Sequence, residues 1–108
     1  MILVRMRTLW DYRGRTVRLT EERLAHILNH PELRGLQSAV TETLANPTLV
    51  IESQTDPSAE LNYRFYLGTR VGDKWLCVVV KYAADDAFVL TAYLTDKPKR
   101  GNQIWPIK

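Results

Sequence analysis

Seven side chains of this sequence are of the types that bind a phosphodiester or move protons around it. They are two histidines, two cations and three hydroxyl-bearing residues: His26, His30, Arg64, Tyr66, Lys81, Thr91 and Tyr93. An imidazole titrates near neutral pH and can act as a general acid or base. Guanidinium and ammonium groups stabilise charge on phosphate oxygens, and hydroxyls donate hydrogen bonds to them. These residues therefore suit a phosphodiester site, provided that the fold brings them together.

The two histidines lie four residues apart, a spacing that places them on one side of a helix. His26 lies roughly opposite the apolar stripe of Leu24, Ile27 and Leu28, so we expect an exposed imidazole. The spacing can hold a metal ion, but no glutamate stands beside His26 as in a zinc-protease helix, and the chain has no third histidine. The sequence therefore predicts neither a metal site nor a cofactor. Simple solvation of both histidines remains the alternative to a catalytic role.

The elements that must position these residues begin with an alternating segment. It has Ile2, Val4 and Met6 on one side and Leu3, Arg5 and Arg7 on the other, followed by Leu9 and Trp10. A period of two predicts a strand. Arg13-Gly14 supplies a turn, and residues 16–19 supply a short return strand. We expect an N-terminal β-hairpin that carries most of the N-terminal arginines.

Two helices are predicted next. Thr20 is a suitable N-cap, and the two glutamates that follow it are stabilised by the positive end of the helix dipole. The apolar spacing continues to Pro31, which ends this helix or begins the next one. A second helix is expected from Glu32 to Ala45, and Asn46-Pro47 ends it.

Beyond the helices, the apolar residues follow a period of two in four segments separated by turn residues. These segments are residues 49–52, 61–67, 75–82 and 87–94. The short connections favour pairing of adjacent antiparallel strands. We therefore predict an α+β fold in one domain of residues 1–108. It has an N-terminal β-hairpin, two helices and an antiparallel meander of about four strands, with the helices packed on one face.

Strand alternation assigns the meander side chains to two faces. The face expected to contact the helices holds Leu76, Val78 and Val80, with Phe88, Leu90 and Ala92 on the following strand and Leu61, Tyr63, Phe65 and Leu67 on the preceding one. The open face then holds Arg64, Tyr66, Lys81, Thr91 and Tyr93, with Trp75 at its margin. Aromatic, basic and hydroxyl groups together favour an RNA or single-strand contact. The alternative is the ordinary solvated face of an antiparallel sheet.

Length, charge and cysteine usage limit the class of protein. With 108 residues and 45% hydrophobic residues, the chain can build one core. The net charge of +3 and the pI near 9.2 are compatible with a polyanionic partner and also with simple solubility. No apolar stretch approaches the ~20 residues that span a bilayer, so we expect a cytoplasmic protein without a membrane contact. Cys77 lies in an apolar run, which predicts a buried, inert thiol.

Several short segments together resemble a known order of motifs. They are Leu19-Thr20 through His26-Ile27, His30-Pro31-Glu32, Asn46-Pro47, Tyr63-Arg64-Phe65-Tyr66 and Val89-Leu90-Thr91-Ala92-Tyr93. This order resembles the phage- and prophage-associated nuclease-like domains of the barnase, EndoU, colicin and RelE (BECR) superfamily, over residues 17–105. The resemblance implies a ribonuclease fold of two helices followed by a four-stranded antiparallel sheet.

The resemblance also implies a site and a reaction. It matches the family's helix histidine to His26, its strand arginine to Arg64 and its last-strand hydroxyls to Thr91 and Tyr93. A base takes the proton of an RNA 2′-OH, and that oxygen attacks the adjacent phosphorus and expels the 5′-oxygen, leaving a 2′,3′-cyclic phosphate. His26 is the candidate for base or acid. The candidates for further RNA contacts are Lys81, Tyr66 and His30.

Two functions follow as hypotheses. The first is a toxin-like, metal-independent endoribonuclease, restrained by a cognate antitoxin or immunity protein. The alternative is a non-catalytic module on the same fold that binds nucleic acid or another protein. The enzyme requires His26, Arg64 and Tyr93 to converge, whereas a binding module requires only a positive surface. The arrangement of these three side chains therefore separates the two hypotheses.

Overall fold

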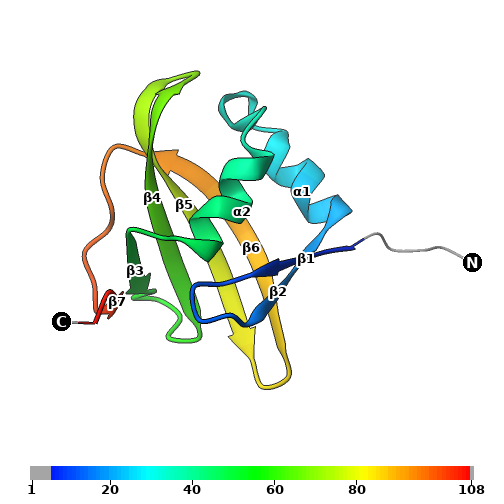
Figure 1. Ribbon diagram of the computed structural model, residues 1–108, viewed down its shortest axis with the longest axis vertical. Coiled ribbons are helices and arrows are strands. Elements are labelled where there is room, and N and C mark those ends of the chain that lie inside the picture. Colours follow the sequence, from blue (N-terminus) through cyan, green and yellow to red (C-terminus); the bar gives the residue numbers. More distant parts are fainter. Residues whose placement is uncertain (1–5, 108) are drawn as a thin grey trace, which may run out of the picture.

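A computed structural model describes residues 6–107 of the chain. In chain order its elements are β1 (Met6–Trp10), β2 (Thr16–Thr20), α1 (Glu21–Leu28), the 3-10 turn η1 (Pro31–Leu33), α2 (Gln37–Ala45), β3 (Leu49–Glu52), β4 (Ala59–Thr69), β5 (Gly72–Ala83), β6 (Asp86–Thr95) and β7 (Gln103–Trp105). The strand expected from Ile2 is therefore described only from Met6 onward, and its first residues lie outside the described range. The α+β class and the N-terminal hairpin are confirmed (Figure 1).

All strands within residues 6–107 belong to one mixed sheet in the order β1-β2-β6-β5-β4-β3-β7. The meander of β3 to β6 is antiparallel throughout. The expectation of about four strands is too low, because the hairpin joins β6 through a parallel pairing of Arg18 with Phe88 and β7 adds to β3. Strand alternation gives no information about such long-range pairing, so the sequence did not reveal a seven-stranded sheet.

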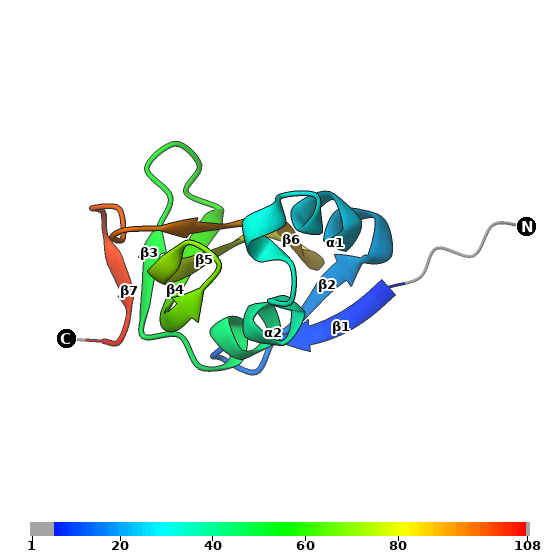
Figure 2. The same ribbon diagram turned by 90° about the horizontal axis from the view of Figure 1, so that it is seen from above.

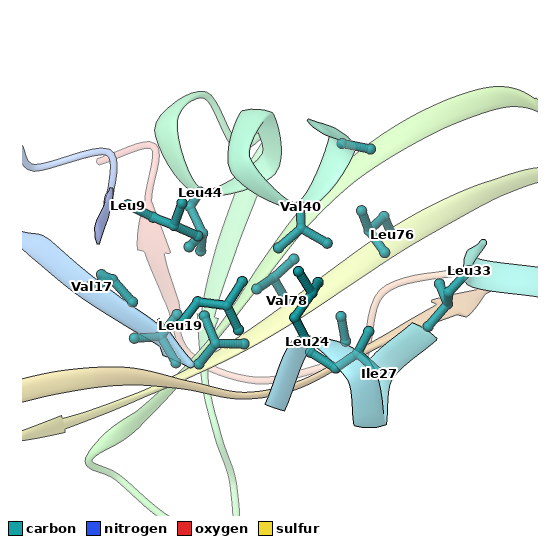
Figure 3. Packing of buried hydrophobic residues seen from close by; sticks show 14 residues of the cluster. Leu9, Val17, Leu19, Leu24, Ile27, Leu33, Val40, Leu44, Leu76 and Val78 are labelled. Carbon is teal, nitrogen blue, oxygen red and sulfur yellow. The ribbon is translucent and has the colours of Figure 1, made fainter. Parts of the chain in front are cut away.

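Both helices contribute to one apolar core on the same side of the sheet, which we call the helix face. Leu24 and Ile27 of α1 and Val40 and Leu44 of α2 belong to a single buried cluster (Figure 3). The strands supply the rest of that cluster, including Leu9, Val17, Leu19, Leu76, Val78, Val80, Val89 and Ala92. Figure 2 shows α2 between β1 on one side and β3 and β4 on the other, so the sheet bends around it.

The helix boundaries are set by local chemistry. The Thr20 hydroxyl accepts a hydrogen bond from the Arg23 amide at 3.0 Å, which confirms the predicted N-cap. The continuous helix expected from Glu32 is wrong. The chain instead forms η1, and Gly35 then adopts a φ of +85°, which no α-helix tolerates. The helix α2 consequently begins only at Gln37.

The expected faces of β6 are also partly wrong. Leu76, Val78 and Val80 of β5 do face the helices. A β-bulge lies between Val79 and Val80, which pair with Thr91 and Val89. The extra residue in β6 shifts the alternation by one position, because a bulge places two residues opposite one. Val89 therefore packs in the helix-face cluster, whereas Leu90 packs on the opposite side of the sheet.

The face opposite the helices, which we call the far face, has an apolar cluster of its own. It consists of Ile51, Ala59, Leu61, Tyr63, Cys77 and Val79, with Leu49, Trp75, Leu90 and Tyr93 packed against it. Leu61 and Tyr63 were expected on the helix face, and that assignment is wrong because they pair with Val79 and Cys77. The predicted burial of Cys77 is confirmed.

Residues 96–102, which we call the crossing segment, cover the far-face cluster between β6 and β7. In Figure 2 this segment lies on the side of the sheet away from α2. The Lys99 amide donates to the Tyr63 hydroxyl at 3.1 Å, and the Glu52 amide donates to the Asn102 carbonyl at 2.9 Å. A Cβ at Gly101 would lie only 2.7 Å from the Ile51 side chain, so the segment passes close to the sheet.

The turn between β1 and β2 is held to the meander by a polar network. The buried Asp11 carboxylate accepts from the Arg13 and Arg15 amides at 2.9 Å each and from the Tyr82 hydroxyl at 2.6 Å. Arg13 also reaches both carboxylate oxygens of Glu60. This network connects the hairpin to β4 and β5. Within residues 6–107, no helix is long and apolar enough to cross a membrane.

Candidate functional site

Arg64 and Tyr66 lie on the helix face, not on the open face where alternation placed them. The Arg64 guanidinium donates to Glu42 at 3.2 Å and to the Asn46 carbonyl at 2.7 Å, so it caps the C-terminal end of α2. The Tyr66 hydroxyl donates to the Glu42 carboxylate at 2.9 Å, and its burial raises the pKa to about 12. Both side chains fasten α2 to β4.

Lys81, Thr91 and Tyr93 do lie on the far face. The register pairs Thr91 with Val79 and Tyr93 with Cys77, both members of the far-face cluster. Thr91 is exposed. Lys81 forms an ion pair with Asp56. The Lys81 hydrogen bond, followed by those from Ser58, lowers the pKa of Asp56 to about 2. The charge of Lys81 is therefore already largely compensated.

The hydroxyl of Tyr93 is inaccessible to a ligand in this conformation. Its oxygen is buried, and no hydrogen-bond partner for it exists among the described residues. Burial, followed by the neighbouring Cys77 and Tyr63, raises the pKa of Tyr93 well above its usual value. The Lys99 ammonium lies 6.0 Å from the centre of the ring. A phosphate cannot reach this hydroxyl unless the crossing segment moves.

His26 lies on the outer surface of α1, as its helical position predicts. It is exposed, and it borders an open depression of about 650 Å³ together with Glu22, Arg23 and Ala25 of the same helix and the capping residues Thr20 and Asn29. His30 is exposed beyond the end of α1, with Glu32 3.8 Å from its ring nitrogen. The helix α1 packs against β2 and β6 (Figure 1). Arg64 belongs to β4 instead, and its guanidinium lies at the C-terminal end of α2.

The three side chains required for the enzyme therefore do not converge. Arg64 lies on the helix face, the Tyr93 hydroxyl is buried on the far face, and His26 lies on the outside of α1. A general acid or base must come within hydrogen-bond distance of the proton that it transfers. The sheet itself separates Arg64 from Tyr93, so these residues do not form one phosphodiester-cleaving site in this arrangement. Among residues 6–107, no group of three or more His, Cys, Asp or Glu side chains is placed to hold a metal ion.

The far face carries a different set of exposed cations, all on the crossing segment. Lys97, Lys99 and Arg100 are exposed, and no carboxylate lies within ion-pair distance of them in the described part of the chain. The acid next to them in sequence, Asp96, is paired with Lys74. Three uncompensated positive charges thus lie within four residues. A surface of this kind attracts polyanions.

Two aromatic rings lie beside the start of the crossing segment. On the far face, Phe65 of β4 pairs with Trp75 of β5, and Trp75 in turn pairs with Thr95 of β6. The rings of Phe65 and Trp75 meet at 5.4 Å in an edge-to-face arrangement, and Phe65 remains 44% exposed. The Thr95 hydroxyl donates to the Lys97 carbonyl at 3.2 Å, so the crossing segment starts next to this pair. We call Phe65, Trp75, Lys97, Lys99 and Arg100 the aromatic–basic surface.

Sequence reasoning missed most of this surface. Phe65 was expected on the helix face, which is wrong, because it pairs with Trp75 on the far face. The cations were overlooked because residues 83–108 have a net charge of only +1, in which Asp85, Asp86 and Asp96 offset most of the positive charge. The signal was present, since Lys97-Pro98-Lys99-Arg100 places three positive charges around one proline. A shorter window for the charge count would have found it.

Comparisons with other proteins give no further guide, because the chain matches no known protein-family model, no curated protein and no solved structure. The resemblance to the BECR superfamily stays a prediction. Any assignment of function must therefore come from the arrangement of side chains described above.

Proposed function

We propose that this protein is a non-catalytic binding module for single-stranded RNA and that the aromatic–basic surface is its contact site. One observation carries the proposal. Lys97, Lys99 and Arg100 have no carboxylate partner among the described residues, and their segment begins at Thr95, which pairs with Trp75 beside the exposed Phe65 ring. Unpaired cations supply affinity for the phosphates, and an exposed ring stacks with an unpaired base.

Several cations elsewhere on the protein are already paired with a carboxylate, and the exposed ones with no ion pair among the described residues, Arg15, Arg23, Arg34 and Arg70, lie apart from one another in the sequence. Arg18 is bound to Asp86, Lys81 to Asp56 and Arg64 to Glu42. A phosphate that approaches one of these residues must compete with a carboxylate already in contact. The crossing segment imposes no such competition, so phosphate binding is favoured there.

Single-stranded rather than duplex nucleic acid fits the dimensions of the site. Consecutive same-face positions on a strand lie about 7 Å apart, which is close to the spacing of extended nucleotides. The Phe65–Trp75 pair and Tyr93 are separated by one such step along the sheet. A base on Phe65 therefore places the next phosphate near Lys99, whose ammonium lies 6.0 Å from the centre of the Tyr93 ring.

The test measures binding of a fluorescein-labelled RNA of about 16 nucleotides by anisotropy at several salt concentrations. The Lys97→Glu/Lys99→Glu variant should bind at least 10-fold more weakly. Replacing the same two cations by alanine should reduce the slope of log affinity against log salt by about 0.7 per cation. Arg23→Glu/Arg34→Glu is the matched control, because it makes the same charge change at exposed arginines on and after α1. Equal losses in both Glu variants would remove the surface from the binding site.

A second measurement separates binding from cleavage. The RNA is incubated with the parent protein and with His26→Ala in excess EDTA, and its integrity is followed on a denaturing gel. We expect intact RNA in both cases. Cleavage by the parent that His26→Ala abolishes would overturn the non-catalytic proposal in favour of the ribonuclease hypothesis. Phe65→Ala should weaken binding by about 5- to 150-fold, since stacking of one base is worth about 1–3 kcal/mol.

A further inference from the structure

The two edges of the sheet differ in how they are protected. At one edge, β7 is only three residues long and Pro106 follows it directly. At the other edge, β1 forms five regular pairs with β2 without a bulge. Natural sheets usually block pairing at an edge with short strands, prolines, bulges or charges. The β7 edge has two of these devices, and β1 has neither a proline nor a bulge.

The side chains of β1 add an apolar surface to this open edge. Leu9 points into the helix-face core, so alternation places Met6, Thr8 and Trp10 on the far face. Met6 is 51% exposed and Trp10 is 55% exposed. No backbone hydrogen bond outside the β1–β2 pairing joins Met6–Trp10 to another described residue, apart from contacts within the following turn. The edge thus offers both backbone groups and apolar side chains.

The one charge on β1 does not block pairing. The Arg7 guanidinium donates to the Glu21 carboxylate at 2.8 Å, within the same chain. Arg7 also lies on the helix-face side of β1, away from Met6 and Trp10. An ion pair of this kind compensates the arginine and keeps it away from the strand edge.

We propose that β1 is a self-association edge and that its occupant is β1 of a second copy of this chain. An antiparallel two-fold arrangement that pairs all five residues of both strands has a single register. In that register Thr8 lies opposite Thr8 of the second copy, Arg7 lies opposite Leu9, and Met6 lies opposite Trp10. No two like charges face each other, and both ends gain a sulfur–aromatic contact. Self-complementarity of this kind is what a two-fold interface requires.

The contact is small, so the dimer is reversible. Two five-residue strands bury less than the ~1,200 Å² of a stable interface, and association in roughly the high-micromolar range is expected. The two-fold axis is perpendicular to the joined sheets, so the far faces of both copies lie on the same side. This inference does not depend on RNA binding, because β2 and β6 lie between β1 and the strands β5 and β4 that carry Trp75 and Phe65.

Cross-linking tests the register directly. Thr8→Cys places two thiols opposite each other, where Cβ atoms are about 4.5–5.5 Å apart. Mild oxidation should therefore give a disulfide-linked dimer at least 10-fold faster than for Thr55→Cys, an exposed control on the β3–β4 loop. The native Cys77 is buried and does not compete. Equal rates for the two variants would overturn the proposed register.

Sedimentation velocity without RNA tests the association itself. The parent protein should sediment faster as its concentration rises, whereas Met6→Lys/Trp10→Lys should remain monomeric. Met6→Glu/Trp10→Lys should recover association at low salt, because the register places each carboxylate opposite an ammonium group. A parent that stays monomeric at the highest concentration would overturn the proposal. RNA affinity measured on dilute monomer is unaffected by either outcome, so the two proposals fail independently.

Discussion

The helix face and the far face are built from the same strands but are closed in different ways. On the helix face, two helices and the β1–β2 hairpin surround a large apolar cluster that includes Leu44, Leu76 and Val78. On the far face, a smaller cluster around Tyr63 and Cys77 is covered by the crossing segment, which has no regular secondary structure between β6 and β7.

This difference assigns different tasks to the two sides. The helices satisfy their own backbone groups and bring polar side chains into contact with Arg64 and Tyr66 of β4. The crossing segment leaves its cations directed to solvent. A single irregular segment with unpaired charges suits ligand binding, whereas helices whose backbone groups are hydrogen-bonded within the helix suit stability. The candidate site therefore lies on the face that contributes less to the core.

The largest expected effect compares one leucine from each face. Leu76 is 0% exposed on the helix face and Leu61 is 7% exposed on the far face. Leu76→Ala should lower the free energy of unfolding by about 3–5 kcal/mol, and Leu61→Ala by about 2 kcal/mol, because the cavity under a thin cover relaxes more completely. Urea denaturation measures both. Equal losses would mean that the crossing segment is as rigid as the helices.

The second effect concerns the polar network around Asp11, which connects the β1–β2 hairpin to β4 and β5. Tyr82→Phe removes the hydroxyl that donates to the buried Asp11 carboxylate at 2.6 Å. The loss should be about 1.5–3 kcal/mol, as for a hydrogen bond to a charged group. Chemical denaturation at pH 7 is the measurement, and Tyr12→Phe, which loses a longer contact to the half-buried Glu60, is the milder control. A neutral Tyr82→Phe would show that water replaces the lost hydroxyl.

The third effect separates two tyrosines of the far face. The Tyr63 hydroxyl accepts from the Lys99 amide, whereas the buried Tyr93 hydroxyl has no partner among the described residues. Tyr63→Phe should cost about 1 kcal/mol and speed hydrogen exchange of the Lys99 amide. Tyr93→Phe should be neutral or stabilising, since it removes an unsatisfied buried oxygen. A marked loss on Tyr93→Phe would reveal a hydrogen bond made through bound water.

The smallest effect concerns the charge of Lys81 on the far face. Its contact with Asp56 holds the carboxyl pKa at about 2, below the ordinary 3.8. A lowered pKa in the folded state favours folding above the ordinary value, and this contribution disappears as the pH falls toward 2. Lys81→Ala should move the Asp56 midpoint upward toward 3.8 in an NMR titration. An unmoved midpoint would assign the shift to Ser58 alone.

Local signals in the sequence were sufficient for several features of individual helices and strands. The Thr20 cap, the exposure of His26, the burial of Cys77 and the helix-facing set that includes Val78 all depend on near neighbours in the chain. Their physical causes are hydrogen bonds and periodicities that extend over a few residues. Such signals are readable without knowledge of the fold.

The tertiary structure alone decided which side of β4 meets the helices. Both sides of that strand carry apolar or aromatic residues, so alternation separates two sets without saying which is inner. The side of β4 that carries Arg64 and Tyr66 faces the helices, because α2 and its C-cap supply hydrogen-bond partners for both residues. The crossing segment covers Tyr63 on the other side of the strand. A shift of the strand register by one residue moves every side chain to the opposite face of the sheet. The bulge opposite Val79 and Val80 has the same effect on part of β6. The chain therefore encoded most of its strands locally, but the faces of β4 and β6, on which the candidate sites depend, were fixed only by contacts between residues distant in sequence.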